Sequence, residues 1–144
     1  MPQARRTIEV DSTPEKAFAV LIDYPSYASF IPEVQHVEIL EARPHGKRVR
    51  FGIAIFGLPV TYTLDLIEEP YRRLSWTLVA SNWLKSVEGS WEIEALDRRQ
   101  VSLAYVQQIT IKGLIPKVVS TKLVGFALPE LLERFKTRIE TLKD

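Results

Sequence analysis

Six stretches of the chain alternate apolar and polar residues with a period of two, and this pattern constrains the fold more than any other feature. They cover residues 37–39, 49–55, 60–66, 74–78, 87–93 and 101–111. A period of two is typical of β-strands with one buried face. Residues 41–48, with Pro44 and Gly46, are expected to form the first turn, and the later turns are short. We therefore expect six consecutive strands in an antiparallel meander with one face covered.

The residues before this meander predict one further strand and two short helices. Residues 6–10 alternate as a half-buried strand does. Thr13 and Pro14 then form a strong helix start, because threonine caps the first turn and proline fits the first helical position. Pro25 ends this helix and can begin a second, short one that runs to about Phe30.

The tail has a helical period from Pro116 to about Leu142. Gly125 and Pro129 mark a bend in it, because a proline inside a helix clashes with the carbonyl four residues earlier. The bend is either a fixed kink or the hinge of a lid formed by residues 116–125. The order of elements predicts an α+β fold, with a curved antiparallel sheet of six or seven strands around a long C-terminal helix, in a single domain over residues 1–144.

The inward face of the six strands carries almost no charge, and only Glu41 breaks this rule. Acid–base catalysis needs carboxylates or histidines inside a pocket, and this face offers none. A mostly apolar surface with a few polar groups is typical of a binding site in which hydrogen bonds only orient the ligand. The polar groups on this face belong to Tyr62, Trp76, Trp91, Tyr105 and Gln107.

A solid core is the competing interpretation of the same face. Buried aromatic side chains mostly serve packing, so a core is favoured at any single apolar position. Tyr105 and Gln107 differ, because a buried phenol or amide must find a partner. A strongly curved sheet around one long helix leaves a gap, and Tyr24, Tyr27 and Phe30 on the short helices suit the wall or mouth of a cavity. The prediction of a cavity therefore rests on the whole face.

Composition excludes several other classes of protein. Lys+Arg 19 against Asp+Glu 18 gives a formal net charge of +1, so no global field favours nucleic acid. The chain has no cysteine and its two histidines are isolated, so we expect no metal site and no cofactor. No apolar run suits a signal peptide or a membrane span. We expect a soluble, cytoplasmic protein and leave peripheral membrane contact open.

Three motifs carry a resemblance to a known family. They are Phe18-x2-Leu21-x-Asp23-Tyr24-Pro25-x-Tyr27-x2-Phe30-Ile31-Pro32, the strand that contains Gly89-Ser90-Trp91, and Leu128-Pro129-Glu130-Leu131-Leu132. With the order of elements, they resemble the START-like (SRPBCC) helix-grip superfamily. The most similar branch holds the polyketide cyclase/dehydrase-like, coenzyme-Q-binding and ribosome-association-toxin-like proteins. The last two groups usually carry Pro-Trp-Cys where this chain has Pro32-Glu33-Val34.

The resemblance implies a helix-grip fold, in which a seven-stranded antiparallel curved sheet wraps around the long C-terminal helix with a hydrophobic tunnel between them. Members of the superfamily commonly bind lipids, quinones or polyketides, and many have no demonstrated enzyme activity. We therefore expect a binding or carrier protein for a small hydrophobic molecule such as a quinone, isoprenoid, lipid or polyketide, with no catalytic residue. The expected ligand-binding residues are Tyr27, Phe30, Phe51, Tyr62, Trp76, Trp91, Tyr105, Gln107, Val119, Leu123 and Phe126.

Two alternatives stay open. The first is a polyketide aromatase/cyclase that protonates an enol from Tyr62, Tyr105 or, less directly, His36. The second is a ribosome-associating module that uses an arginine-rich rim near Arg72 and Arg73. The same rim suits a phospholipid surface. We expect no contact with DNA, and the oligomeric state is open.

Overall fold

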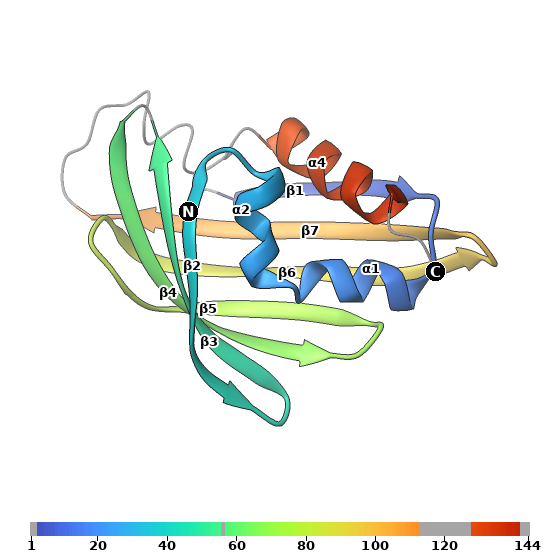
Figure 1. Cartoon of the computed structure of the whole chain (residues 1–144), viewed down its shortest axis with the longest axis horizontal. Coiled ribbons are helices and arrows are strands. Elements are labelled where there is room, and N and C mark those ends of the chain that lie inside the picture. Colours follow the sequence, from blue (N-terminus) through green and yellow to red (C-terminus); the bar gives the residue numbers. More distant parts are fainter. Residues whose placement is uncertain (1–2, 56, 113–127, 142–144) are drawn as a thin grey trace.

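The structure is a computed structural model that describes residues 3–55, 57–112 and 128–141. Seven strands form one antiparallel sheet in the order β1-β7-β6-β5-β4-β3-β2 (Figure 1). The strands are β1 (Gln3–Val10), β2 (Val34–Arg43), β3 (Gly46–Ile55), β4 (Leu58–Glu69), β5 (Arg73–Ser81), β6 (Leu84–Asp97) and β7 (Gln100–Ile111). The strands from β2 to β7 follow one another in space as they do along the chain, so the predicted meander is confirmed. The N-terminal strand pairs with the last strand, β7.

The predicted short helices are confirmed. They are α1 (Pro14–Leu21), the 3-10 turn η1 (Tyr24–Ser26) and α2 (Tyr27–Phe30). The Thr13 hydroxyl accepts a hydrogen bond from the backbone N–H of Lys16 at 3.3 Å, and Pro14 is the first residue of the helix. Both features are those that the sequence predicts for a helix start.

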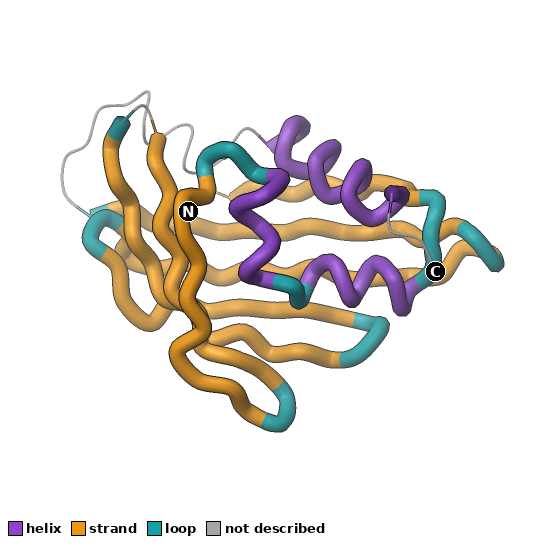
Figure 2. The backbone as a smooth tube through the Cα atoms, in the orientation of Figure 1, coloured by secondary structure: helices purple, strands orange, loops and turns teal. Residues whose placement is uncertain are grey.

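The helices lie together on one face of the sheet (Figure 2). The fourth described helix is α4 (Leu128–Thr141), which contacts β1 and α1, while α1 contacts β5 and β6. Leu21 of α1, Leu103 of β7 and Ile139 of α4 have no exposed surface. The core therefore lies between this helical layer and the concave face of the sheet.

The tail helix is confirmed only for the part that the structure describes. Leu131, Leu132, Phe135 and Ile139 form its buried stripe, with the spacing that one face of a helix requires. The first half of the predicted helix, with Gly125, lies outside the described residues. The bend and the lid therefore stay predictions.

The predicted turn over residues 41–48 is wrong, because β2 runs to Arg43 and β3 begins at Gly46. Only Pro44 and His45 connect the two strands. Charged residues of this stretch pair across the sheet, as the Arg48 guanidinium does with the Asp65 carboxylate at 2.7 Å. A Cβ atom at position 46 would lie 2.0 Å from the carbonyl oxygen of Leu66, so this position needs glycine.

The inward position predicted for Ile39 is also wrong, since 41% of its surface is exposed. β2 is an edge strand, so its side chains have strand neighbours on one side only. The register of β2 against β3 also shifts between Ile39 and Glu41. Such bulges are frequent in edge strands and interrupt the regular alternation of faces.

Candidate ligand-binding cavity

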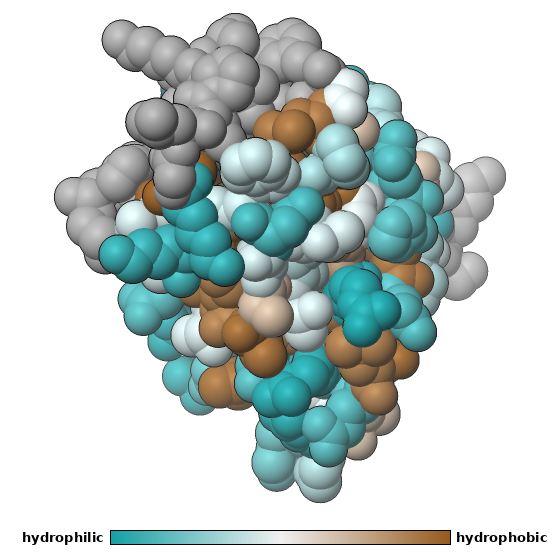
Figure 3. All heavy atoms as spheres, turned by 90° about the vertical axis from the view of Figure 1, so that its left-hand side faces the viewer, coloured by the Kyte–Doolittle hydropathy of each residue, from teal (hydrophilic) through white to brown (hydrophobic). Residues whose placement is uncertain are grey.

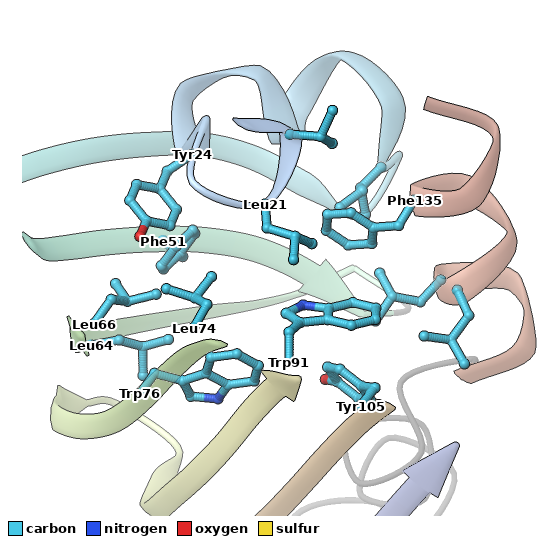
Figure 4. Close-up of a cluster of buried hydrophobic side chains, with 14 of the residues drawn as sticks. Leu21, Tyr24, Phe51, Leu64, Leu66, Leu74, Trp76, Trp91, Tyr105 and Phe135 are labelled. Atoms are coloured by element: carbon cyan, nitrogen blue, oxygen red, sulfur yellow. The ribbon is translucent and has the colours of Figure 1, made fainter. Parts of the chain in front are cut away.

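A cavity of about 110 Å³ lies between the concave face of the sheet and the helices. Its walls come from β3 to β7, from the segment around α2, and from α4. The lining residues are Tyr27, Ile31, Phe51, Ile53, Tyr62, Leu64, Leu66, Leu74, Trp76, Leu84, Val87, Trp91, Tyr105, Gln107, Ile109, Leu131 and Phe135. None of these side chains is charged at neutral pH. Figure 4 shows Trp76, Trp91 and Tyr105 on neighbouring strands, with Phe135 approaching from α4.

The structure brings most of the expected site residues together at this cavity. Those that line it are Tyr27, Phe51, Tyr62, Trp76, Trp91, Tyr105 and Gln107. Phe30 does not line it. Its ring packs edge-on against the ring of Phe135, with centroids 5.2 Å apart, and the Arg138 guanidinium lies 5.6 Å from its centroid. Val119, Leu123 and Phe126 lie outside the described residues.

The aliphatic part of the wall was missed by the sequence analysis, which favoured aromatic and polar groups. Leu64, Leu74, Val87 and Ile109 all line the cavity, and each stands on the inward phase of its strand. The alternation of apolar and polar residues in these strands could therefore have identified them as lining residues. Phe135 was visible as part of the apolar stripe of the tail helix, but no local pattern showed that it reaches the cavity.

Aromatic rings form a continuous set of contacts along the cavity wall. The rings of Phe51 and Tyr62 stack with centroids 5.3 Å apart, and the rings of Trp91 and Tyr105 lie 4.8 Å apart. Phe135 meets Trp91 at 5.3 Å with the rings inclined by 62°. Such offset and edge-to-face contacts hold the rings in fixed orientations. The shape of the cavity is therefore set by packed aromatic side chains.

The phenol groups of the cavity keep their protons at neutral pH. Burial raises the pKa of Tyr27, Tyr62 and Tyr105 well above the ordinary value for tyrosine. The Tyr27 hydroxyl donates a hydrogen bond to the backbone carbonyl of Leu21. The hydroxyls of Tyr62 and Tyr105 make no hydrogen bond to any residue that the structure describes. These two phenol groups therefore remain available as neutral donors to a molecule inside the cavity.

A second polar cluster, which the sequence analysis missed, lies beside the cavity. The Tyr24 hydroxyl donates to the Glu68 carboxylate at 2.7 Å, and the Lys47 ammonium lies 2.8 Å from the same carboxylate. Tyr24 has no exposed surface, and its ring meets the rings of Tyr27 and Phe51 edge-on. This cluster ties the segment of short helices to β3 and β4. It supports the cavity wall and does not line the cavity.

Replacing Tyr24 by phenylalanine should lower the free energy of unfolding by about 1.5 to 3 kcal/mol, the usual range for a hydrogen bond to a charged group. Urea denaturation followed by circular dichroism measures the change. Tyr71→Phe is the matched control, because the Tyr71 side chain is exposed and its hydroxyl has no partner among the described residues. Equal effects of the two substitutions would show that the Tyr24–Glu68 bond adds nothing to stability.

The arginine-rich rim is more mixed in charge than the sequence suggested. Arg73 lies 3.9 Å from the Glu92 carboxylate, and Arg50 lies 3.1 Å from Glu38. A surface depression near Arg72 is also lined by acidic side chains. On the face seen in Figure 3, hydrophobic and hydrophilic residues alternate in small patches. Contact with a ribosome or a membrane surface stays a prediction.

Taken together, a curved antiparallel sheet, a helical layer on one face and an apolar cavity between them define a helix-grip protein. Residues 10–136 match the family described as polyketide cyclase/dehydrase and lipid transport. The chain therefore belongs to this family. The predicted START-like recognition is confirmed, whereas membership of the coenzyme-Q-binding branch stays a prediction. No curated protein matches the sequence.

Two solved structures show how widely this fold is shared. A START superfamily protein from Mycobacterium smegmatis is 21% identical, with a TM-score of 0.82 over 98% of this chain and 99% of that one. The ZhuI aromatase/cyclase from Streptomyces sp. R1128 is 18% identical, with a TM-score of 0.85 over 96% of this chain and 93% of that one. At these identities the likeness shows the fold alone. Within the described residues, no helix is both long and apolar enough to cross a membrane.

Proposed function

We propose that this protein binds a small hydrophobic molecule in the cavity between the sheet and the helices. One observation carries the proposal: the cavity wall is apolar, yet the hydroxyls of Tyr62 and Tyr105, which line it, have no partner among the described residues. These hydroxyls are open to the cavity, because the Ser12 oxygen is the only buried side-chain oxygen or nitrogen without a partner in the described part of the chain. A ligand that accepts hydrogen bonds from the two hydroxyls replaces water there and is held in one orientation.

The size of the cavity limits which part of a ligand it can hold. Typical ligand pockets measure roughly 300 to 1,000 Å³, and an apolar cavity of about 150 Å³ in another protein holds benzene. The cavity of about 110 Å³ is smaller than that and is not fully enclosed, so it suits one ring or a short branched chain that extends partly outside it. Burying about 150 Å² of apolar ligand surface at ~25 cal/mol per Å² contributes about 4 kcal/mol, which corresponds to a Kd of about 1 mM. Tighter binding therefore requires the hydrogen-bond donors of the wall.

Native mass spectrometry of the purified protein, followed by extraction and identification of any co-purified molecule, tests the proposal. We expect a bound neutral compound of low molecular mass. The variant Val87→Phe adds a ring at a lining position and should lose that compound while keeping its circular dichroism spectrum. Val79→Phe is the matched control, because Val79 is exposed on the neighbouring strand β5. An empty protein that no apolar compound stabilises against heat would overturn the proposal.

An aromatase/cyclase activity is the second candidate, favoured by two unpartnered phenols that face one cavity. The family match and the likeness to an aromatase/cyclase support it. The raised pKa values of Tyr62 and Tyr105 suit groups that donate a hydrogen bond to a carbonyl and do not suit a general base. Cyclisation of a poly-β-keto substrate should fall in Tyr62→Phe and Tyr105→Phe. Unchanged cyclisation in both variants would exclude this role for the phenols.

A further inference from the structure

Trp76, Gly89 and Gln107 stand in one row across three neighbouring strands. Trp76 of β5 is paired with Gly89 of β6, and Gly89 is paired with Gln107 of β7. A Cβ atom at position 89 would lie 2.5 Å from three atoms of the Trp76 indole, including its nitrogen. The indole therefore lies flat over the glycine. This position lets it cross β6 and reach the side chain of Gln107.

The contact between these side chains determines which way the amide of Gln107 points. The Trp76 indole N–H donates to the Gln107 carbonyl oxygen at 2.9 Å. An indole nitrogen can only donate, so the amide must turn its oxygen toward Trp76. The NH₂ group of Gln107 is then left with two protons. No described residue accepts a hydrogen bond from it.

The polar groups of the described lining that have no partner are all able to donate a hydrogen bond. They are the NH₂ group of Gln107, the hydroxyls of Tyr62 and Tyr105, and the indole N–H of Trp91, for which no described residue is an acceptor. The described lining contains no carboxylate to balance a cation and no lysine, arginine or histidine to balance an anion. An ion would therefore lose its hydration without gaining a charged partner. A pure hydrocarbon would leave every donor unpaired.

We infer that the cavity selects a neutral ring compound that carries a carbonyl group, with the carbonyl oxygen held by Gln107, Tyr62 or Tyr105. The inference rests on the proposed function and adds the chemical class of the ligand. The row of Trp76, Gly89 and Gln107 is what distinguishes this cavity from one lined only by apolar rings. Gln107 is a ligand-binding residue in this scheme, and Trp76 is the residue that positions it.

Binding of four matched probes to the full chain tests the inference. Acetophenone carries the carbonyl, ethylbenzene has a similar shape without it, benzoate is an anion and phenyltrimethylammonium is a cation. Isothermal titration at neutral pH should show acetophenone binding at least tenfold more tightly than each of the other three. Equal binding of acetophenone and ethylbenzene would overturn the inference and leave the proposed function standing. Binding of none of the probes would count against both.

Infrared spectroscopy of bound acetophenone gives a readout that depends on the hydrogen bond itself. We expect the carbonyl stretch to move to lower frequency on binding and to move back in part in Gln107→Leu. Gln108→Leu is the matched control, because the next residue of a strand points to the opposite face. Gly89→Ala should displace the Trp76 indole and shift the carbonyl stretch as Gln107→Leu does. If either variant fails to fold, Tyr105→Phe is the substitute, because it removes another donor of the cavity. A carbonyl frequency unchanged by binding, or equal in the wild type and in every cavity variant, would overturn the inference.

Discussion

Replacing Phe135 by alanine should lower the free energy of unfolding by about 3 to 5 kcal/mol, the usual range for a buried phenylalanine. Only 3% of Phe135 is exposed. Its ring meets those of Tyr27, Phe30 and Trp91 at centroid distances of 5.3, 5.2 and 5.3 Å. One side chain of α4 therefore contacts both the α2 segment and the sheet. Its loss leaves a hole that these fixed rings cannot refill.

Urea denaturation of the variant measures this effect. Phe135→Leu keeps most of the apolar volume and should lose clearly less stability than the alanine variant. Glu133→Ala, at an exposed position of the same helix, should change stability by no more than about 0.5 kcal/mol. A loss below about 1 kcal/mol for Phe135→Ala would show that the ring does not hold the helix to the sheet. The same variant should also enlarge the cavity and accept bulkier ligands.

Alkaline pH should unfold the protein cooperatively, because four of its five tyrosines have raised pKa values in the folded state. Burial is the main cause for Tyr24, Tyr27, Tyr62 and Tyr105. In the unfolded chain these phenols titrate near pH ~10. Their contribution to stability is therefore complete below that pH and is lost as the pH rises above it. For each phenol that is protonated in the folded state and ionised in the unfolded chain, the free energy of unfolding falls by up to about 1.4 kcal/mol per pH unit. For all four phenols together the fall is up to about 5.5 kcal/mol per pH unit.

Absorbance of phenolate and far-ultraviolet circular dichroism, recorded together from pH 8 upward, test this prediction. The phenolate signal of these four tyrosines should appear with the loss of β-structure and should not precede it. Tyr105→Phe removes one of these titrating groups. The free energy of unfolding of this variant should therefore fall less steeply with pH, by about 1.4 kcal/mol per pH unit. Ionisation of all tyrosines while the circular dichroism spectrum is still native would contradict the predicted burial.

Much of the fold could be predicted from the sequence, because its signals are local. Alternation along each strand and the Thr13-Pro14 start of α1 depend on neighbours in the chain, and the structure confirms both. The errors fall at β2, where Ile39 lies exposed beside a bulge. An edge position depends on which strands pair, and alternation within one strand carries no information about its neighbours.

The candidate site was predictable in outline for a related reason. Aromatic residues on the inward phase had to face the helical layer, so Tyr62, Trp91 and Tyr105 line the cavity, and their role in ligand binding stays a prediction. The partner of each polar group was not predictable. Tyr24 looked like one more ring at the mouth of a cavity, yet its hydroxyl is held by Glu68, which lies 44 residues further along the chain.

The sequence by itself determined the order of the elements, which residues of β3 to β7 face inward, and the almost uncharged inner face of these strands, because burial must match the local period of apolar residues. Only the tertiary structure decided which buried donors stay free. Trp76 reaches Gln107 because the register of three strands puts Gly89 between them, and that register is a property of the assembled sheet. The uncharged cavity is therefore encoded along the chain, whereas its proposed preference for a carbonyl arises from strand pairing.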